Sequence, residues 1–182
     1  MAWTAPMTFV ANTVLTAAQL NTHLRDNLLE TAPAKATTQG GFFVATGGHA
    51  IAQRMFLNNV VSGDFATTST SWVDGNPPGP TITMETGERA FLAFGCRGYS
   101  TDSLNDIGSM GIEVSGATSQ AASTATAYRW SGALASPSRQ SQASQSIVFA
   151  DLTPGINTFT VKYQSSGGDC HFVNRRLMVL GM

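Results

Sequence analysis

The sequence predicts a mainly β protein: an antiparallel, jelly-roll-like β-sandwich preceded by an extended N-terminal arm and one short α-helix. Three observations support this prediction. From about Met55 onward, apolar residues recur with the period of two that is typical of strands. Turn sequences rich in glycine and proline separate these runs, and no long helical pattern follows residue 31. A closed barrel is the alternative arrangement for such strands.

The first segment is predicted to be an apolar, extended arm. Trp3, Phe9 and Val10 are its large apolar residues, and Pro6 favours an extended backbone around it. Large apolar side chains of this kind dominate binding energies when they fill pockets on a partner. We therefore expect the arm to anchor the chain to another protein.

A short amphipathic helix follows, and the sequence marks its start. Thr16 and Gln19 have the spacing of a capping box, in which each side chain bonds the backbone amide of the other residue. Leu15 and Leu20 have the spacing of a hydrophobic staple across this cap. Pro33 cannot continue a helix, so the helix is expected to end near residue 31.

Leu20, Leu24 and Leu28 recur every four residues and form one narrow apolar stripe on the helix. A helix of roughly fourteen residues is only marginally stable in isolation. The stripe therefore needs a surface to pack on, either the β-domain of its own chain or neighbouring chains, and both alternatives stay open. Residues 1–34 are expected to serve attachment and oligomerisation, with a linker at 35–54 that contains one short strand, and the sandwich at 55–182.

Several runs predict the strands of the sandwich. Arg89–Cys96 is almost wholly apolar, as expected for a central strand that is covered on both faces. Apolar and other residues alternate in Met110–Val114 and Phe159–Tyr163, which predicts strands with one buried face. The chain closes on a further strand-like run from Phe172. Three stretches rich in small polar residues are predicted to be exposed loops: 100–109, 116–127 and 136–146.

Composition excludes several classes of function. Charged residues make up only 12% of the 182 residues, against about a quarter in typical proteins, and the net charge is −1. A nucleic-acid-binding protein would show a basic stripe, whereas the only adjacent basic pair is Arg175–Arg176, which is expected to face solvent on a strand. The apolar content of 42% argues against disorder. Low charge with many small and hydroxyl residues suits extracellular or virion coat proteins.

The two cysteines and the N-terminus bear on the compartment. Cys96 and Cys170 lie in apolar runs and are expected to be buried free thiols; a bridge between them is the alternative. The N-terminus lacks the basic and apolar regions of a signal peptide, and no apolar run has the ~18 residues of a membrane span. We expect synthesis and folding in a cytoplasm, without membrane contact.

No constellation of catalytic, cofactor-binding or metal-binding residues stands out, which predicts that the chain is not an enzyme. Two weaker alternatives rest on particular residues. Cys96, Asp169 and His171 would form a nucleophile cluster if their strands met. Asp102 and Asp106 would hold a calcium ion, although the spacing of the usual calcium-binding loop is missing.

Two tryptophans are candidates for ligand contact. An exposed indole face suits a pyranose ring, so Trp72 and Trp130 are the residues through which the domain would contact a sugar. Burial of both tryptophans in the core is the interpretation that the sequence favours, and sugar contact is the role that stays open beside it. A module that binds glycans on the host surface is therefore an alternative function for this chain.

The two ends of the chain resemble a known group of proteins. The first end reads Trp3-x-x-Pro6-x-Thr-Phe9-Val10, then Val14-Leu15-Thr16-Ala17-x-x-Leu20-Asn21-x-x-Leu24-Arg25-Asp26-Asn27-Leu28. This resembles the opening of minor structural proteins of tailed bacteriophages. The runs Leu152–Tyr163 and Asn174–Val179 are similar to the C-terminal β-sandwich of the same proteins. The resemblance implies a non-enzymatic virion component, of the head-fibre, capsid-decoration or minor-tail type, often trimeric.

We therefore predict a structural component of a tailed-bacteriophage virion, made in the cytoplasm of the bacterial host, and displayed as a decoration or head-fibre subunit. Its predicted partners are other copies of itself, in a homotrimer, and the major capsid or tail proteins. The alternatives are a minor tail or tail-fibre protein and a module that binds host glycans. The residues expected to anchor or oligomerise the chain are Trp3, Pro6, Phe9, Val10, Leu15, Leu20, Leu24 and Leu28.

Overall fold

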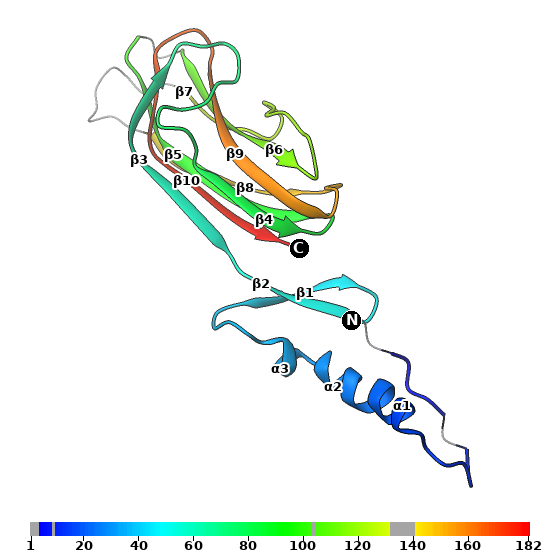
Figure 1. The fold of residues 1–182 in the computed structure, drawn as a ribbon. Helices are drawn as coiled ribbons and strands as arrows, with labels where there is room; N and C mark the ends of the chain where they lie inside the picture. Colours follow the sequence, from blue (N-terminus) through cyan, green and yellow to red (C-terminus); the bar gives the residue numbers. More distant parts are fainter. Residues whose placement is uncertain (1–3, 9, 103–104, 132–140) are drawn as a thin grey trace. The chain divides into compact units, whose positions relative to one another are not determined.

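The computed structural model describes residues 4–8, 10–102, 105–131 and 141–182. The chain divides into two compact units: an N-terminal unit that ends at Met55, and a C-terminal unit of Phe56–Gly181. In Figure 1 the helices and one hairpin belong to the first unit, and all other strands belong to the second. The division lies beside the boundary at residue 55 that separates the predicted linker from the predicted sandwich.

The helix of the N-terminal unit begins where the sequence places it. The hydroxyl of Thr16 accepts the backbone N–H of Gln19 at 3.2 Å, and the backbone N–H of Thr16 donates to Gln19 Oε1 at 2.9 Å, so the capping box is confirmed. Three segments then follow one another directly: α1 (Ala17–Leu20), the π-helical η1 (Asn21–Asp26) and α2 (Asn27–Leu29). Pro33 lies in the first turn of a separate short helix, α3 (Ala32–Lys35), where its missing N–H leaves no bond unmade.

The segment predicted to be a linker with one strand forms a two-stranded hairpin instead. β1 (Phe42–Gly47) and β2 (Ala50–Arg54) pair antiparallel, and His49 takes up a positive φ of 58° in the turn between them. The Oε1 of Gln53 accepts the backbone N–H groups of Thr37 and Thr38, at 2.8 and 3.1 Å. These bonds fold the segment before β1 back onto the hairpin, which no sequence period indicated.

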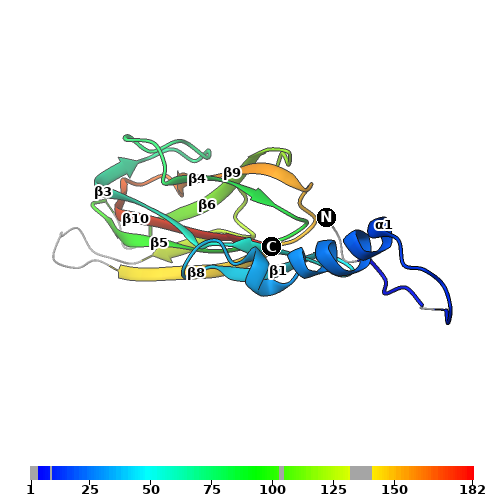
Figure 2. The same ribbon diagram turned by 60° about the horizontal axis from the view of Figure 1, so that its bottom comes forward.

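The C-terminal unit is an antiparallel β-sandwich, as predicted. One four-stranded sheet has the order β3–β10–β5–β8 and the other the order β4–β9–β6–β7, and the two layers are visible in Figure 2. The strands are β3 (Leu57–Thr67), β4 (Thr81–Thr86), β5 (Ala90–Ser100), β6 (Ile107–Gly116), β7 (Tyr128–Ser131), β8 (Ser141–Phe149), β9 (Gly155–Ser165) and β10 (Cys170–Gly181).

The core lies between the two sheets and follows the predicted alternation. On β5 the side chains of Leu92, Phe94 and Cys96 are buried. On the facing sheet, β6 and β9 contribute the buried side chains of Met110, Ile112, Val114, Phe159, Val161 and Tyr163. Strands with one face on a shared core and a polar face outside are what a sandwich requires, so the sequence period predicted this core correctly.

A bulge changes the phase of β10. The register of β10 shifts after Val173 against both neighbouring strands, β3 and β5. Asn174, at this shift, has a φ of 52°. A bulge inserts one extra residue, so the side chains beyond it change face. Arg175 is therefore fully buried, together with Leu177. The prediction that Arg175 faces solvent was wrong, whereas Arg176 is exposed.

Two of the three predicted loops are shorter than expected. β6 starts at Ile107, inside the predicted loop 100–109, and β8 starts at Ser141, inside the predicted loop 136–146. Both strands have glycine or serine where a buried strand more often has large apolar residues. The alternation of apolar residues therefore did not indicate where they start. Residues 103–104 and 132–140 lie outside the described part. The loop 116–127 joins β6 to β7 as predicted, with one isolated bridge between Val114 and Gln120.

Candidate functional site

The leucine stripe of the N-terminal unit, Leu20, Leu24 and Leu28, lies open on the helix. The exposed fractions of these three residues are 45%, 58% and 58%. Leu15 and Val10, also predicted to anchor the chain, are exposed as well, and so is Pro6. Fully burying one leucine contributes roughly 1.5–3 kcal/mol. Covering the stripe would therefore stabilise an assembly substantially.

The arm packs on the row of the helix next to the leucine stripe, at His23 and Asn27. Asn27 is buried; its Nδ2 donates to the carbonyls of Thr4 and His23 at 3.0 and 3.1 Å, and its Oδ1 accepts the Thr4 N–H at 2.9 Å. The Nδ1 of His23 lies 3.1 Å from the Ala5 carbonyl oxygen. The arm thus packs on a polar face and leaves the leucines uncovered. Trp3 and Phe9, the predicted arm anchors, lie outside the described residues.

The hairpin adds further partly exposed apolar side chains. Phe42 and Phe43 are neighbours on β1, so they point to opposite faces of the hairpin, and both are exposed. An isolated two-stranded hairpin is marginally stable in water at best. A hairpin that shows a phenylalanine on each face is therefore suited to being covered by another protein surface.

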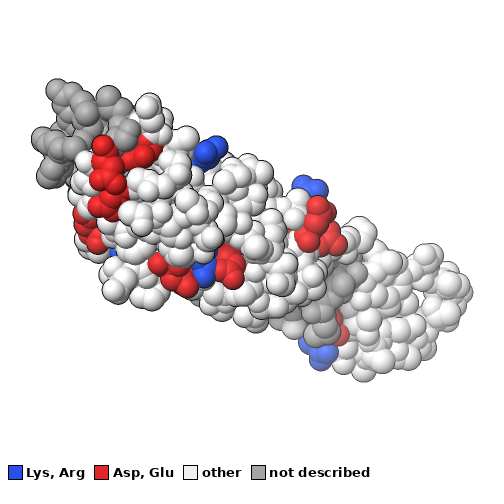
Figure 3. Space-filling model, turned by 90° about the horizontal axis from the view of Figure 1, so that it is seen from above, with Lys and Arg blue, Asp and Glu red and all other residues white. Residues whose placement is uncertain are grey.

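The charged side chains of the molecule are sparse and mixed. On the face shown in Figure 3, Asp and Glu residues and Lys and Arg residues form small separate patches among uncharged residues. One patch of the sandwich is a network in which Lys162 Nζ lies 2.7 Å from both Asp74 Oδ1 and Glu113 Oε2. Burial alone would lower the pKa of Lys162, but these two partners outweigh it and raise the pKa. No basic stripe of the kind that binds nucleic acid runs over the described part of this face.

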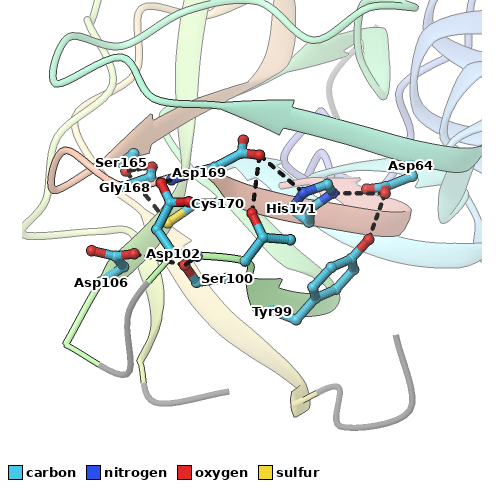
Figure 4. Close-up of polar contacts among 11 residues, drawn as sticks. Asp64, Tyr99, Ser100, Asp102, Asp106, Ser165, Gly168, Asp169, Cys170 and His171 are labelled. Carbon is cyan, nitrogen blue, oxygen red and sulfur yellow. Dashed lines mark hydrogen bonds and ion pairs between the residues drawn. The ribbon is translucent and has the colours of Figure 1, made fainter. Parts of the chain in front are cut away.

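A polar cluster lies where β5 ends and β10 begins, and Figure 4 shows its side chains. The rings of Tyr99 and His171 stack at a centroid distance of 4.3 Å. Both point to Asp64 on β3: the Tyr99 hydroxyl donates to Oδ2 at 2.8 Å, and His171 Nδ1 lies 2.7 Å from the same oxygen. Burial, and then the hydrogen bond to Asp64, raise the pKa of Tyr99 to about 12. Asp64 is thus already bonded twice within the protein.

The remaining carboxylates of the cluster hold loops together. Asp102 accepts the backbone N–H of Asp169 at 2.9 Å, and Asp106 accepts the Ser100 hydroxyl at 2.6 Å. Asp169 in turn accepts the Thr101 hydroxyl at 3.1 Å. The two carboxylates considered for calcium thus brace the β5–β6 and β9–β10 connections in this structure. Among the described residues, no group of three or more His, Cys, Asp or Glu is placed to hold a metal ion.

The structure does not bring together the three residues considered for a nucleophile cluster. Cys96 faces the core at 4% exposure, and burial raises the pKa of its thiol to about 12. His171 and Asp169 lie instead in the polar cluster on the outside, at a distance of 3.4 Å between Nε2 and Oδ2. Cys96 and Cys170 are free and buried, as expected, so no bridge joins them. A protonated, enclosed thiol is inert as a nucleophile.

Trp130 is a core residue, as the sequence favoured, so the ligand contact considered for it is not available in this structure. It is 4% exposed, and its ring lies against the edge of Phe172 at a centroid distance of 5.9 Å. Its indole also covers Gly98 and Gly108, at each of which an added Cβ would lie 2.3 Å from a ring atom. Neither indole face is free for a sugar. Trp72 is half-buried on the outer face of β6, where its six-membered ring covers Gly111.

Sequence reasoning missed the buried Arg175. Its guanidinium lies 5.6 and 5.5 Å from the ring centroids of Phe65 and Tyr163. Its Nη1 donates to the carbonyl of Pro77, while Nε and Nη2 have no partner in the described part of the chain. Tyr163 donates its hydroxyl to the Gly79 carbonyl at 2.7 Å. The two side chains together hold the β3–β4 connection. Only Asn174, a residue type that tolerates positive φ, hinted at the bulge that turns Arg175 inward.

The helices among the described residues are too short or too polar to cross a membrane.

Comparisons with known proteins find likeness in structure only. No protein-family model matches the chain, and no curated protein sequence matches it. The VP2 subviral particle of infectious bursal disease virus is similar over 76% of this chain and 37% of that chain, with a TM-score of 0.47 and 12% identity. The structure of the Gx strain of that virus is similar over 75% of this chain and 35% of that chain, with a TM-score of 0.43 and 12% identity. The structure of the Gt strain is similar over 76% of this chain and 37% of that chain, with a TM-score of 0.42 and 11% identity. This chain spans little more than a third of the length of each of those chains.

Proposed function

We propose that this chain is a structural component of a tailed-bacteriophage virion, a decoration or head-fibre subunit that its N-terminal unit attaches to the particle. The observation that carries the proposal is the open leucine stripe. A short helix that buries an asparagine and leaves Leu20, Leu24 and Leu28 exposed needs a partner surface. The sequence pattern of residues 3–28, which resembles minor phage structural proteins, contains all three leucines.

The proposal includes self-assembly into a homotrimer. Three copies that share one particle site would bring three leucine stripes and three hairpins together, and Phe42 and Phe43 would add apolar area to the contact. Each copy then covers side chains that a monomer leaves in water. The major capsid or tail proteins of the particle would cover the arm, which carries Val10.

The proposed role of the sandwich is positional rather than catalytic. Its core cysteine is enclosed, and the carboxylates of its polar cluster are bonded within the fold. His171, the imidazole of that cluster, faces the carboxylates of Asp64 and Asp169, and none of its printed contacts within the described chain is with a serine or cysteine, the pairing that a serine–histidine or cysteine–histidine mechanism requires. The sandwich would be displayed outward and present its loops to the surroundings of the virion.

Location on the particle separates this proposal from its alternative, a minor tail or tail-fibre protein. Quantitative mass spectrometry of purified virions measures the number of copies relative to the major capsid protein. We expect many copies per particle, in proportion to the capsid lattice. A handful of copies would favour the tail alternative, and absence of the chain from purified virions would overturn the proposal.

A further inference from the structure

The outer face of the β3–β10–β5–β8 sheet carries a groove of about 870 Å³, and all four strands contribute to its lining. The groove is hollow because its floor is made of small residues. Gly95 on β5 pairs with Arg176 on one side and with Ser144 on the other, and Ala93 pairs with Met178. Gly95 is buried beneath its neighbours and Ala93 is half-buried, so these two positions form the base of the groove and add no bulky side chain to it.

Two arginines stand over this floor. Arg176 lies directly opposite Gly95, and Arg97 follows two residues after Gly95 on the same face, so the two are diagonal neighbours on adjacent strands. Neighbouring like charges on one sheet face disfavour each other. Neither arginine forms an ion pair with any described residue, and no carboxylate lines the groove. Arg97 Nε is buried without a hydrogen-bond partner in the described chain.

The surrounding side chains cannot neutralise the two arginines. Asp64 is the acidic residue on the next row of the same face, paired with Val173, but Tyr99 and His171 already share its Oδ2. The other polar residues that line the groove are neutral: Asn58, Gln142, Ser144 and Asn174. The groove thus offers two planar cations and several amide and hydroxyl groups.

We infer that this groove binds an acidic saccharide, a sugar that carries a carboxylate or phosphate group. The guanidinium groups of Arg97 and Arg176 take the anionic group, because their planar forks match carboxylate and phosphate oxygens. The amides and Ser144 bond the sugar hydroxyls. An acidic peptide is less suited, since Met178 is the one large apolar side chain that both faces outward and lines the groove, and the exposed Val60 opposite Arg176 lies outside that lining. The inference goes beyond the proposed virion role and does not depend on attachment.

The site differs from the tryptophan site that the sequence suggested. Trp130 is in the core, and Trp72 lies on the opposite sheet. The groove was invisible in the sequence because Arg97 and Arg176 are 79 positions apart and only the β5–β10 pairing brings them together.

Isothermal titration of the purified full chain, with no particle present, tests the inference. The probes are tetragalacturonate, its neutral methyl ester, glucose 6-phosphate, inorganic phosphate and an oligoglutamate. Tetragalacturonate, glucose 6-phosphate or both should bind, and binding should weaken as salt is raised. The methyl ester should bind at least about tenfold more weakly than the acid, because it lacks the charged partner.

Two variants and a matched control test whether the ligand binds in this groove. Arg176→Gln and Arg97→Lys should each weaken binding by about tenfold or more, the first by removing a charge and the second by removing the fork. Arg129→Gln, an exposed arginine on β7 of the other sheet, should bind as the wild type does. Arg176 is exposed, so its variant should fold normally, which circular dichroism checks.

Four results would overturn the inference: no binding of either acidic sugar, equal binding of the methyl ester, equal binding by Arg176→Gln, or binding of oligoglutamate as tight as that of the sugars. If inorganic phosphate alone bound tightly, and Arg176→Gln abolished that binding, the groove would be an anion site and the inference of a saccharide ligand would be wrong. None of these results bears on virion attachment, so the two proposals fail separately.

Discussion

The guanidinium of Arg175 donates a hydrogen bond to the carbonyl oxygen of Pro77 at 3.2 Å, from a position with no solvent exposure. This contact joins β10 to the connection between β3 and β4. Phe65 and Tyr163 flank the cation and supply its electrostatic partners. A core cation without a carboxylate is costly, so its contribution to stability is open to a direct test.

We predict that Arg175→Met leaves the free energy of unfolding within about 1 kcal/mol of the wild type or raises it, because methionine fills much of the space without a buried charge. Arg175→Ala should lower it by about 3 kcal/mol, because it leaves a cavity. Urea denaturation of both variants measures this difference. If Arg175→Met were as unstable as Arg175→Ala, the charge itself would be stabilising and the prediction would be wrong.

The packing of Trp130 on two glycines gives a second prediction. Gly108→Ala places a methyl group 2.3 Å from the Trp130 ring, so the ring has to move and the free energy of unfolding should fall by about 1–3 kcal/mol. In a Trp130→Leu background the same substitution should cost much less, because the obstructing ring is gone. A double-mutant cycle in urea measures the coupling. Equal costs in both backgrounds would show that Gly108 is needed for another reason.

The enclosed thiol of Cys96 predicts a dependence on alkaline pH. Its pKa is about 12 in the fold, against an ordinary value of 9.0. Below pH 9 both states hold the proton and stability is unaffected; between pH 9 and about 12 the unfolded chain releases the proton first, so stability falls as pH rises. This one group contributes a slope of up to about 1.4 kcal/mol per pH unit.

Urea denaturation at pH 8 and pH 10.5 measures that slope. Cys96→Ala should lose less stability over this interval than the wild type, although its absolute stability is lower at both pH values because of the cavity. At pH 8 a thiol reagent should label neither cysteine in the native chain. Identical slopes in the two proteins would contradict the role assigned to burial.

The leucine stripe predicts self-association. The full chain should sediment as a trimer at high concentration, and Leu24→Gln with Leu28→Gln should shift it to monomer, since each leucine contributes roughly 1.5–3 kcal/mol when it is covered. Val148→Gln is the matched control, because Val148 is 50% exposed but lies on the sandwich. A wild-type chain that stays monomeric at high concentration, or a control that dissociates equally, would count against the stripe as the contact.

The sequence predicted those parts that depend on local chemistry. The Thr16–Gln19 cap is correct because capping is decided within one helical turn. The strands with regular alternation are correct because their burial follows a fixed period. What it missed depends on contacts between distant segments. The bulge at Asn174 turned Arg175 inward, and the packing of the Trp130 indole on Gly98 and Gly108 depends on strands that the sequence did not place together.

The same distinction applies to the candidate surfaces. The leucine stripe was predictable because three residues share one helix, whereas its exposure depends on the arm packing on Asn27 beside the stripe and not on the leucines. The groove over Gly95 was not predictable, because its cations come from strands that only the sheet order makes neighbours. Pairing of distant strands is therefore what the sequence alone left undetermined.

Attachment through the N-terminal unit is tested most directly by adding chain 56–182 to virions from which the protein is missing. Co-sedimentation with such virions compares this truncated chain with the full chain, and circular dichroism confirms that its β-structure is retained, as the separate core of Phe56–Gly181 predicts. We predict that the full chain binds the particles in many copies and that the truncated chain stays in the supernatant. A truncated chain that decorates virions as well as the full chain does would contradict attachment through the N-terminal unit.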